Sequence, residues 1–353
     1  MNAAFRIRQT WIIARLHLGR VFFSRRSFWV YLLAMFPAVV FLAHGIQMKI
    51  QHRWVPSRVT PVAILESIPE GTGEDEVIKK AGIPIKDRSF QNKQKKQQIR
   101  HMQYFDGERW WYLNFREGIL QRKHNRQIFN FTQDRLAFAG MFQFYYLRLA
   151  IFFGCLGIFA NLFRGEMLDK TLHFWFLTPA RREVLLAGKY LAGVIAAVLI
   201  FTVGAVLGFA MMLWPHHAAQ VTAYWQDQGL SHLFWYASAA ALGCIGYGSV
   251  FLALGLLFRN PIIPAIVVLF WENISGILPA LLQKLSVLHY AQSLCPVPVP
   301  TDDSMPLLFR LLISPADPPS TTTAVFGFLI LTVLVLWVTS RIVRRLEINY
   351  STD

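Results

Sequence analysis

The segment that decides the fold is Arg164–Leu191, with the sequence RGEMLDKTLHFWFLTPARREVLLAGKYL. It separates two apolar runs, Leu147–Phe163 and Tyr190–Leu213, and each run is long enough to be a membrane span. The segment is therefore predicted to be a loop held close to one membrane face. Basic residues are typical of short cytoplasmic loops, so this face is predicted to be the cytoplasmic one. The basic residues are Arg164, Lys170, Arg181, Arg182 and Lys189.

The loop is also predicted to be folded. Glu166 and Lys170 are four residues apart, in the orientation that stabilises a helix. Thr178 is a suitable N-cap and Pro179 suits the first helical position, so a second helix is predicted to begin there and to continue into the next span. A short helix, a turn and a second helix would make the loop rigid.

Four parts of this loop carry a resemblance to a known family. They are Glu166, Asp169–Leu172, Leu177–Glu183, and Gly188 with Lys189. In this order they resemble the cytoplasmic loop of ABC type-2 transporter permeases, although Lys170 stands where that family often has glycine. A second stretch, which begins Phe270-Trp271-Glu272-Asn273, is similar to the fifth span of some members.

The resemblance implies the membrane-spanning permease subunit of an ATP-driven exporter. Its partners would be a separate ABC ATP-binding subunit and a second permease subunit, either another copy in a homodimer or a paired chain. No cofactor is expected, because ATP would be bound by the partner and this chain has no Gly-x-x-x-x-Gly-Lys-Ser/Thr motif. The residues implied to couple the chain to the ATPase are Glu166, Asp169, Lys170, Thr171, Thr178, Pro179, Arg181, Arg182 and Lys189.

Composition independently indicates an integral membrane protein. The chain has 353 residues, of which 54% are hydrophobic, and a mean hydropathy of +0.38. The net charge of +15 is concentrated at span ends and in one insert, which favours contacts with anionic membrane lipids over nucleic acid. Three cysteines lie far apart in the sequence, so neither a disulfide framework nor a zinc site is expected.

The predicted fold class is an all-α integral membrane protein with six transmembrane helices, cytoplasmic N and C termini and a small α+β extracytoplasmic insert. Its expected location is the plasma (inner) membrane, as a multi-pass protein. The predicted parts are an interfacial elbow helix at 1–27, the first span at 28–46, the insert at 47–140, a five-helix membrane region at 141–340 with the coupling loop at 164–189, and a cytoplasmic tail at 341–353.

The elbow helix is predicted to lie at the cytoplasmic membrane surface on an apolar stripe, with its arginines reaching lipid headgroups. The stripe consists of Ile7, Trp11, Ala14, Leu18 and Phe22. A plain basic tail that only sets the topology is the alternative.

The insert is predicted to contain a strand at Val59–Glu66, a polar helix at Lys86–Gln103 and a hairpin at Gln103–Phe115 around Asp106-Gly107. Its length exempts it from the charge rule for short loops, so the parity of the spans places it outside the cell.

The remaining spans are predicted from apolar runs and breakers. The second span is expected at Phe144–Phe163, with Arg148 as an interfacial residue, and the external loop at Trp214–His232 lacks Lys and Arg. The fifth span is predicted at Ile262–Leu282 and the sixth at Thr321–Ser340. Small residues at four-residue spacing in the third and fourth spans predict close helix packing inside the bundle or at a dimer seam.

Glu272 is the candidate for the transport pathway, together with its neighbours Trp271 and Asn273. A carboxylate in a span is costly and should face the bundle interior or a polar pathway. No Lys or Arg is expected at the same depth in another span, so a buried ion pair is not predicted. The alternative is a helix-packing role near the outer interface. No metal site is predicted, since His216, His217, His232 and Asp227 lack ligand spacing.

The sequence also bears on two other classes of function. An intramembrane enzyme would need His-Glu-x-x-His, Gly-x-Ser-x-Gly or paired carboxylates within spans, and the sequence contains none of these. A receptor, a sensor or a mechanotransmitting ABC subunit that binds ligands with its insert remains open.

Overall fold

The computed structural model describes two compact units. One comprises Met1–Leu42, Asp134–Leu213 and His217–Asp353, and the other comprises Ala43–Gln133 with Trp214–His216. The residues described within them are 3–24, 27–53, 59–92, 97–107, 109–127, 130–168, 180–258, 260–298 and 319–344.

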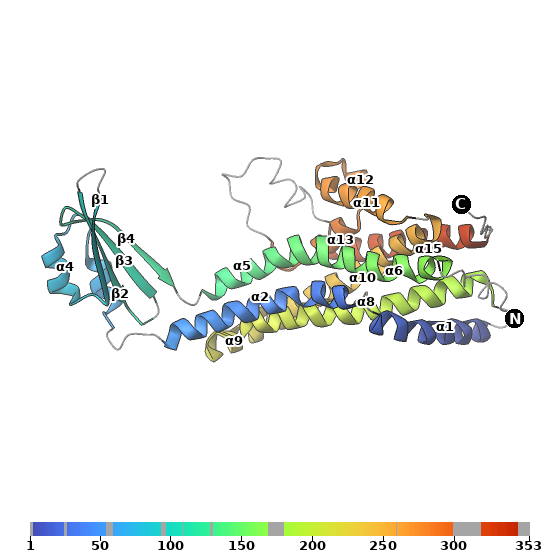
Figure 1. Cartoon of the computed structure of the whole chain (residues 1–353), viewed down its shortest axis with the longest axis horizontal. Coiled ribbons are helices and arrows are strands. Elements are labelled where there is room, and N and C mark those ends of the chain that lie inside the picture. Colours follow the sequence, from blue (N-terminus) through green and yellow to red (C-terminus); the bar gives the residue numbers. More distant parts are fainter. Residues whose placement is uncertain are drawn as a thin grey trace. The chain divides into compact units, whose positions relative to one another are not determined.

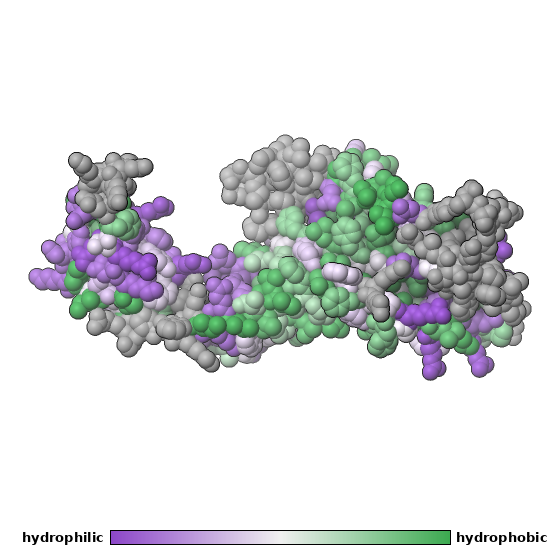
Figure 2. All heavy atoms as spheres, in the orientation of Figure 1, coloured by the Kyte–Doolittle hydropathy of each residue, from purple (hydrophilic) through white to green (hydrophobic). Residues whose placement is uncertain are grey.

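The first unit is helical, and five of its described helical stretches are long and apolar enough to cross a membrane (Figure 1). Apolar surface covers much of this unit in Figure 2, as expected for a protein that faces lipid. The structure therefore shows a multi-pass membrane protein. The five stretches are Ser27–Ile50, Phe131–Phe163, Arg182–Leu213, Ala218–Leu257 and Thr321–Arg344.

These stretches combine α-helical and π-helical segments. The elements are α1 (Ala3–Phe23), α2 (Ser27–Arg53), α5 (Phe131–Met141), the π-helix η1 (Phe142–Ala150), α6 (Ile151–Leu168), α8 (Arg182–Leu213), α9 (Ala218–Tyr224), the π-helix η2 (Trp225–Gly229), α10 (Leu230–Leu257), α11 (Ile262–Ile274), the short 3₁₀ turn η3 (Ser275–Ile277), α12 (Ala280–Gln283), α13 (Val287–Ser293) and α15 (Thr321–Arg344).

The prediction of a continuous fifth span at Ile262–Leu282 is wrong. The α11 helix has 13 residues and ends at Ile274, so it is about 20 Å long, against about 30 Å for a bilayer core. Gly276 follows within a 3₁₀ turn, and Pro279 precedes the short helix α12. Both residues disfavour continuation of a helix, which is the physical reason for the break.

Two other boundaries also differ from the prediction. The segment Trp214–His232, predicted as a loop, is helical over most of its length, because a helix begins at Ala218 and runs through η2 into α10. The second membrane stretch begins at Phe131 rather than Phe144, since polar residues such as Gln133 are accommodated in its first turns.

Several helix ends meet at one end of the bundle. Arg182 at the start of α8 donates hydrogen bonds to the carbonyls of Val343 and Arg344 at the end of α15, and Glu183 forms an ion pair with Arg344. Gly255 near the end of α10 packs against the backbone of α6 at Ala160. The start of α8 and the ends of α6, α10 and α15 therefore lie together.

Small residues allow close contacts inside the bundle, as predicted. A Cβ added at Gly193 or Gly248 would meet the ring of Phe159 at 2.5 Å. One added at Gly204 would lie 2.5 Å from the carbonyl oxygen of Ala34 in α2. Helices α2, α6, α8 and α10 thus approach one another more closely than larger side chains would permit.

The second unit contains a four-stranded antiparallel sheet in the order β1-β2-β3-β4. The predicted hairpin around Asp106-Gly107 is confirmed, with β2 and β3 paired from Ile99↔Arg116 to Phe105↔Trp110. Gly107 has φ of +104°, a backbone conformation that favours glycine in this turn. The strands are β1 (Lys86–Asn92), β2 (Gln97–Phe105), β3 (Arg109–Arg116) and β4 (Ile119–Gln127).

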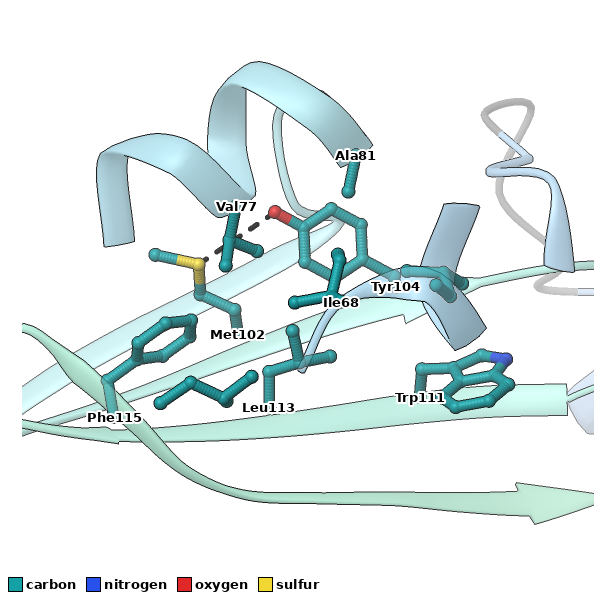
Figure 3. Packing of buried hydrophobic residues seen from close by; sticks show 10 residues of the cluster. Ile68, Val77, Ala81, Met102, Tyr104, Trp111, Leu113 and Phe115 are labelled. Atoms are coloured by element: carbon teal, nitrogen blue, oxygen red, sulfur yellow. Dashed lines mark hydrogen bonds between the residues drawn. The ribbon is translucent and has the colours of Figure 1, made fainter. Parts of the chain in front are cut away.

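Two short helices, α3 (Val62–Ser67) and α4 (Glu74–Ala81), cover one face of this sheet. Figure 3 shows the side chains of Met102, Tyr104 and Leu113 packed beneath Val77 of α4. The remaining buried residues of the cluster are Leu65, Ile68, Ala81, Trp111, Phe115 and Leu120.

Two predictions for the insert are wrong. Val62–Ser67 forms a helix instead of a strand, with Leu65 fully buried under the sheet. The predicted polar helix at Lys86–Gln103 is instead β1 and most of β2, paired from Lys86↔Gln103 to Asn92↔Gln97. Cross-strand pairing outweighs the helix propensity of the lysine- and glutamine-rich sequence.

Candidate functional site

The Glu272 carboxylate anchors the segment that follows the break in α11. It accepts hydrogen bonds from Ser286 Oγ at 2.6 Å and from the backbone N–H groups of Val287 and Leu288, both at 3.0 Å. Glu272 is 4% exposed, and the two N–H groups belong to the first turn of α13. The carboxylate therefore fixes α13 against α11 by occupying the donors at the start of that helix.

A cation does lie at the depth of Glu272, contrary to the prediction. Arg148 of η1 places Nη1 3.4 Å from Oδ1 of Asn273, and it lies within electrostatic range of Glu272 and Tyr247. Arg148 is thus part of the polar cluster rather than a purely interfacial residue. The structure brings Glu272 and Asn273 together with Arg148. Trp271, which precedes Glu272 in the sequence, is half-buried.

The π-helix η1 connects this cluster to most of the bundle. Tyr145 donates a hydrogen bond to the Leu33 carbonyl of α2 at 3.1 Å, and Tyr146 donates one to the Phe201 carbonyl of α8 at 2.5 Å. Gln143 donates one to the carbonyl of Val297, beyond α13, at 2.9 Å. Segments of π-helix are frequent at functional sites, and this one joins α2, α8, α11 and the chain after α13.

A cavity of about 540 Å³ opens between α13 and the first turns of α15. Lys284, His289 and Thr323 supply polar groups on its lining, and Phe326 and Ile330 supply apolar ones. The cavity adjoins the segment that Glu272 anchors. The polar cluster and this cavity together form the candidate functional site.

Ser286 is expected to be a stabilising N-cap of α13. Its Oγ accepts a hydrogen bond from the His289 N–H at 3.0 Å while donating to Glu272. Replacing Ser286 by alanine should lower the free energy of unfolding by about 1–2 kcal/mol. Denaturant titration of the protein in mixed micelles measures this change. Ser293→Ala is the matched control, because that hydroxyl only donates within its own helix, to Tyr290.

The predicted coupling residues fall into two groups. Asp169, Lys170, Thr171, Thr178 and Pro179 lie outside the described residues, as does the side chain of Glu166, whose backbone belongs to α6. Of the others, Arg181 is exposed immediately before α8, which begins at Arg182, and Arg182 is engaged by the end of α15. The predicted helix start at Pro179 also lies outside the described residues.

Lys189 is not a loop residue but a fully buried member of the bundle. It is 0% exposed, and its Nζ donates to the Leu162 carbonyl at 2.7 Å and lies 4.2 Å from the ring centroid of Phe163. The neighbouring Gly188 lets α1 approach α8 closely, because a Cβ added at Gly188 would lie 2.7 Å from the side chain of Ile13. This Gly-Lys pair therefore brings α1, α6 and α8 together.

The face of α1 that packs on α8 differs from the predicted stripe. Helix α1 lies alongside α8 (Figure 1), and Ile13, Ala14 and His17 are buried. Of these three only Ala14 belongs to the predicted stripe, whereas the predicted Ile7 is 70% exposed and Trp11 is 54% exposed. The contact of α1 with α8 buries a face of α1 that is shifted by one residue from the predicted stripe. The periodicity of the α1 sequence does not reveal this contact. The exposed apolar residues leave the remaining surface of α1 suited to a membrane interface.

Stability is expected to depend on pH through His17. Burial, with further contributions from Lys189 and Arg20, lowers the pKa of His17 to about 4. The unfolded chain binds this proton near pH 6.5, so stability is full above that pH and falls as the pH drops toward 4. The expected loss is about 2 kcal/mol between pH 7 and pH 5.

Denaturant titrations at both pH values measure this loss. His17→Gln should remove it, whereas the exposed control His44→Gln should retain it. An equal pH dependence in wild type and His17→Gln would assign the effect to other groups.

No protein-family model matches the chain, and no curated protein matches its sequence. The fold and the cluster define a multi-pass membrane protein with a polar centre at a broken helix. Among the described residues, no group of three His, Cys, Asp or Glu side chains is placed to hold a metal ion.

Proposed function

We propose that the chain is the membrane-spanning permease subunit of an ATP-driven ABC exporter in the plasma (inner) membrane. It would act with a separate ABC ATP-binding subunit and with a second permease subunit, either another copy or a paired chain. The observation that carries the proposal is the junction at Gly188 and Lys189, where α1, α6 and α8 meet directly after the basic loop. A force applied to that loop would reach three helices at once.

The helix ends support a six-crossing arrangement with both termini on the cytoplasmic side. Helices α10 and α15 both finish at the end of the bundle where α8 begins. The chain must therefore return to the opposite end between Leu257 and Thr321. In this proposal α11 and α13 make that crossing in two pieces, with Glu272 at the joint.

Copurification tests the proposal most directly. The tagged chain, expressed with candidate ATP-binding subunits of its host, should retain one of them, and ATP hydrolysis should drive transport in vesicles. Arg181→Glu should lower ATP-driven transport without loss of insertion, because Arg181 is exposed while Arg182 holds α15. A chain that purifies without any ATPase, yet binds ligands through its insert, would favour a receptor or sensor.

Sidedness is tested by labelling introduced cysteines. Gln98 in β2 and Gln228 in η2 are exposed, and both should react with an impermeant reagent added outside the cell. Ala180 should react only after the membrane is opened. External labelling of Ala180 would contradict the proposed coupling loop.

A further inference from the structure

The strand register segregates charge between the two faces of the sheet. Residues paired across strands share a face, and successive residues alternate between faces. The face opposite α3 and α4 is named the open basic face. Its residues are Lys86, Arg88, Phe90, Ile99, His101, Gln103, Trp110, Tyr112, Asn114, Arg116, Ile119, Arg122, His124 and Arg126. Five of these are Lys or Arg, two are His, and none in this described part of the sheet is acidic. Phe105 shares their register but is 1% exposed and is not counted with them.

The carboxylates of Asp87, Asp106 and Glu117 bind groups that do not lie on the open basic face. Asp87, on the helix-covered face, accepts three hydrogen bonds from Arg100, which also pairs with Glu74 of α4. In the turns, Asp106 accepts from the indole N–H of Trp111 at 2.7 Å, and Glu117 accepts from the Gln98 N–H at 3.0 Å. The positive charge of the open basic face is therefore not neutralised by the described carboxylates of this unit.

The open basic face also carries rings and exposed apolar side chains. Tyr112 stacks on His124 with their ring centroids 5.0 Å apart. The ring centroids of Phe90 and His101 are also 5.0 Å apart. At one end, Phe90 is 50% exposed and Ile119 is 46% exposed, with Arg116 between them in the register. Cations beside exposed apolar and aromatic residues are typical of surfaces that enter a lipid headgroup layer.

The sheet is joined to the apolar helices by short segments of chain. β4 ends at Gln127 and the apolar stretch of the next span begins at Phe131, while α2 ends at Arg53, nine residues before α3 begins at Val62. Such short connections give lipid headgroups a high effective concentration at the sheet. Four strands at about 4.8 Å spacing make the face about 14 Å wide.

We propose that the open basic face binds the anionic headgroups of the membrane's own phospholipids. The clustered cations attract phosphate groups, and Phe90 and Ile119 enter the headgroup layer at the edge. A soluble polyanion would be attracted by the same cations but would leave those apolar side chains in water. Membrane lipid satisfies both features of the face, and the inference does not depend on transport activity.

Fluorescence quenching in lipid nanodiscs tests the proposal on the full chain. An environment-sensitive dye is attached at Ile119→Cys, with Cys295 replaced by Ser, and quenched by phospholipids that carry a nitroxide on the headgroup. Discs containing phosphatidylglycerol should give about twofold more quenching than zwitterionic discs. The excess should disappear in about 0.5 M salt, where the Debye length is about 4 Å. A dye at Lys79→Cys, on α4, should show no excess.

Charge-reversal variants distinguish an effect of the open basic face from an effect of the net charge of the whole unit. Arg88→Glu with Arg122→Glu should abolish the excess quenching, and Lys79→Glu with Lys80→Glu, on exposed positions of α4, should retain it. The neutral pair Arg88→Gln with Arg122→Gln should reduce the excess if the reversed pair fails to fold. Equal quenching in both kinds of disc would overturn the proposal. A dye response to dextran sulfate but not to anionic lipid would instead assign the face to a soluble polyanion.

Discussion

Replacing Glu272 by alanine is expected to lower the free energy of unfolding by about 3–5 kcal/mol, the range seen when one partner of a buried charged network is removed. The change leaves Ser286 Oγ and the N–H groups of Val287 and Leu288 without their acceptor in a buried site. Each stranded donor costs about 1–3 kcal/mol. Denaturant titration in mixed micelles measures the loss.

Glu272→Gln separates charge from hydrogen bonding less cleanly than the sequence suggested. Both carboxylate oxygens accept hydrogen bonds, so the amide –NH₂ group of glutamine would face at least one N–H or O–H donor. We expect a loss of about 1–3 kcal/mol, smaller than that of the alanine variant.

Asn273→Ala is the control for the Glu272 variants. It removes the hydrogen bond from Arg148 Nη1 to Asn273 Oδ1, which at 3.4 Å is longer than those that Glu272 accepts. It should cost less than Glu272→Gln. A Glu272→Ala protein as stable as wild type would contradict the anchoring role of the carboxylate. If stability survives in Glu272→Gln but transport changes, the cluster has a function beyond holding α13.

The membrane helices were predictable because long apolar runs have few alternatives in a bilayer. The break in α11 had a local signal in Gly276 and Pro279, but the preceding apolar run outweighed it. Arg148 and Asn273 lie 125 residues apart in the sequence, so no local pattern announces their contact. The π-helical geometry of η1 likewise has no sequence signature in the residues that form it.

The insert was harder to predict because β1 lacks the apolar alternation that β3 has. In β1 both faces are largely polar, since Lys86 and Arg88 lie on the open basic face and Asp87 pairs with Arg100 on the other. The helix α4, by contrast, had readable signals: acidic residues in its first turn, basic residues in its last, and Gly82 after it.

Lys189 shows how a loop motif can have a structural meaning that the sequence does not reveal. The sequence pattern predicts that the basic residues of Arg164–Leu191 share a cytoplasmic location, yet Lys189 is buried and its Nζ contacts α6. The neighbouring Gly188 explains why: it lets α1 close over the first turns of α8. The pair thus serves packing as well as topology.

Lys189→Ala is expected to lower the free energy of unfolding by about 2–4 kcal/mol, because it leaves a cavity and removes a charged hydrogen bond. Lys189→Met fills the same space without a charge to desolvate, so its stability should stay within about 1.5 kcal/mol of wild type. Lys189→Glu should not fold, since a carboxylate would face the Leu162 carbonyl.

The methionine variant also tests the link between Lys189 and His17. Lys189 helps to lower the pKa of His17, so its removal should raise that pKa and shrink the stability loss between pH 7 and pH 5. Denaturant titrations of the single and double variants at both pH values measure this coupling. If Lys189→Met is as unstable as Lys189→Ala, the charge itself holds α6 to α8. If Lys189→Met is as stable as wild type, the shape of the side chain holds them.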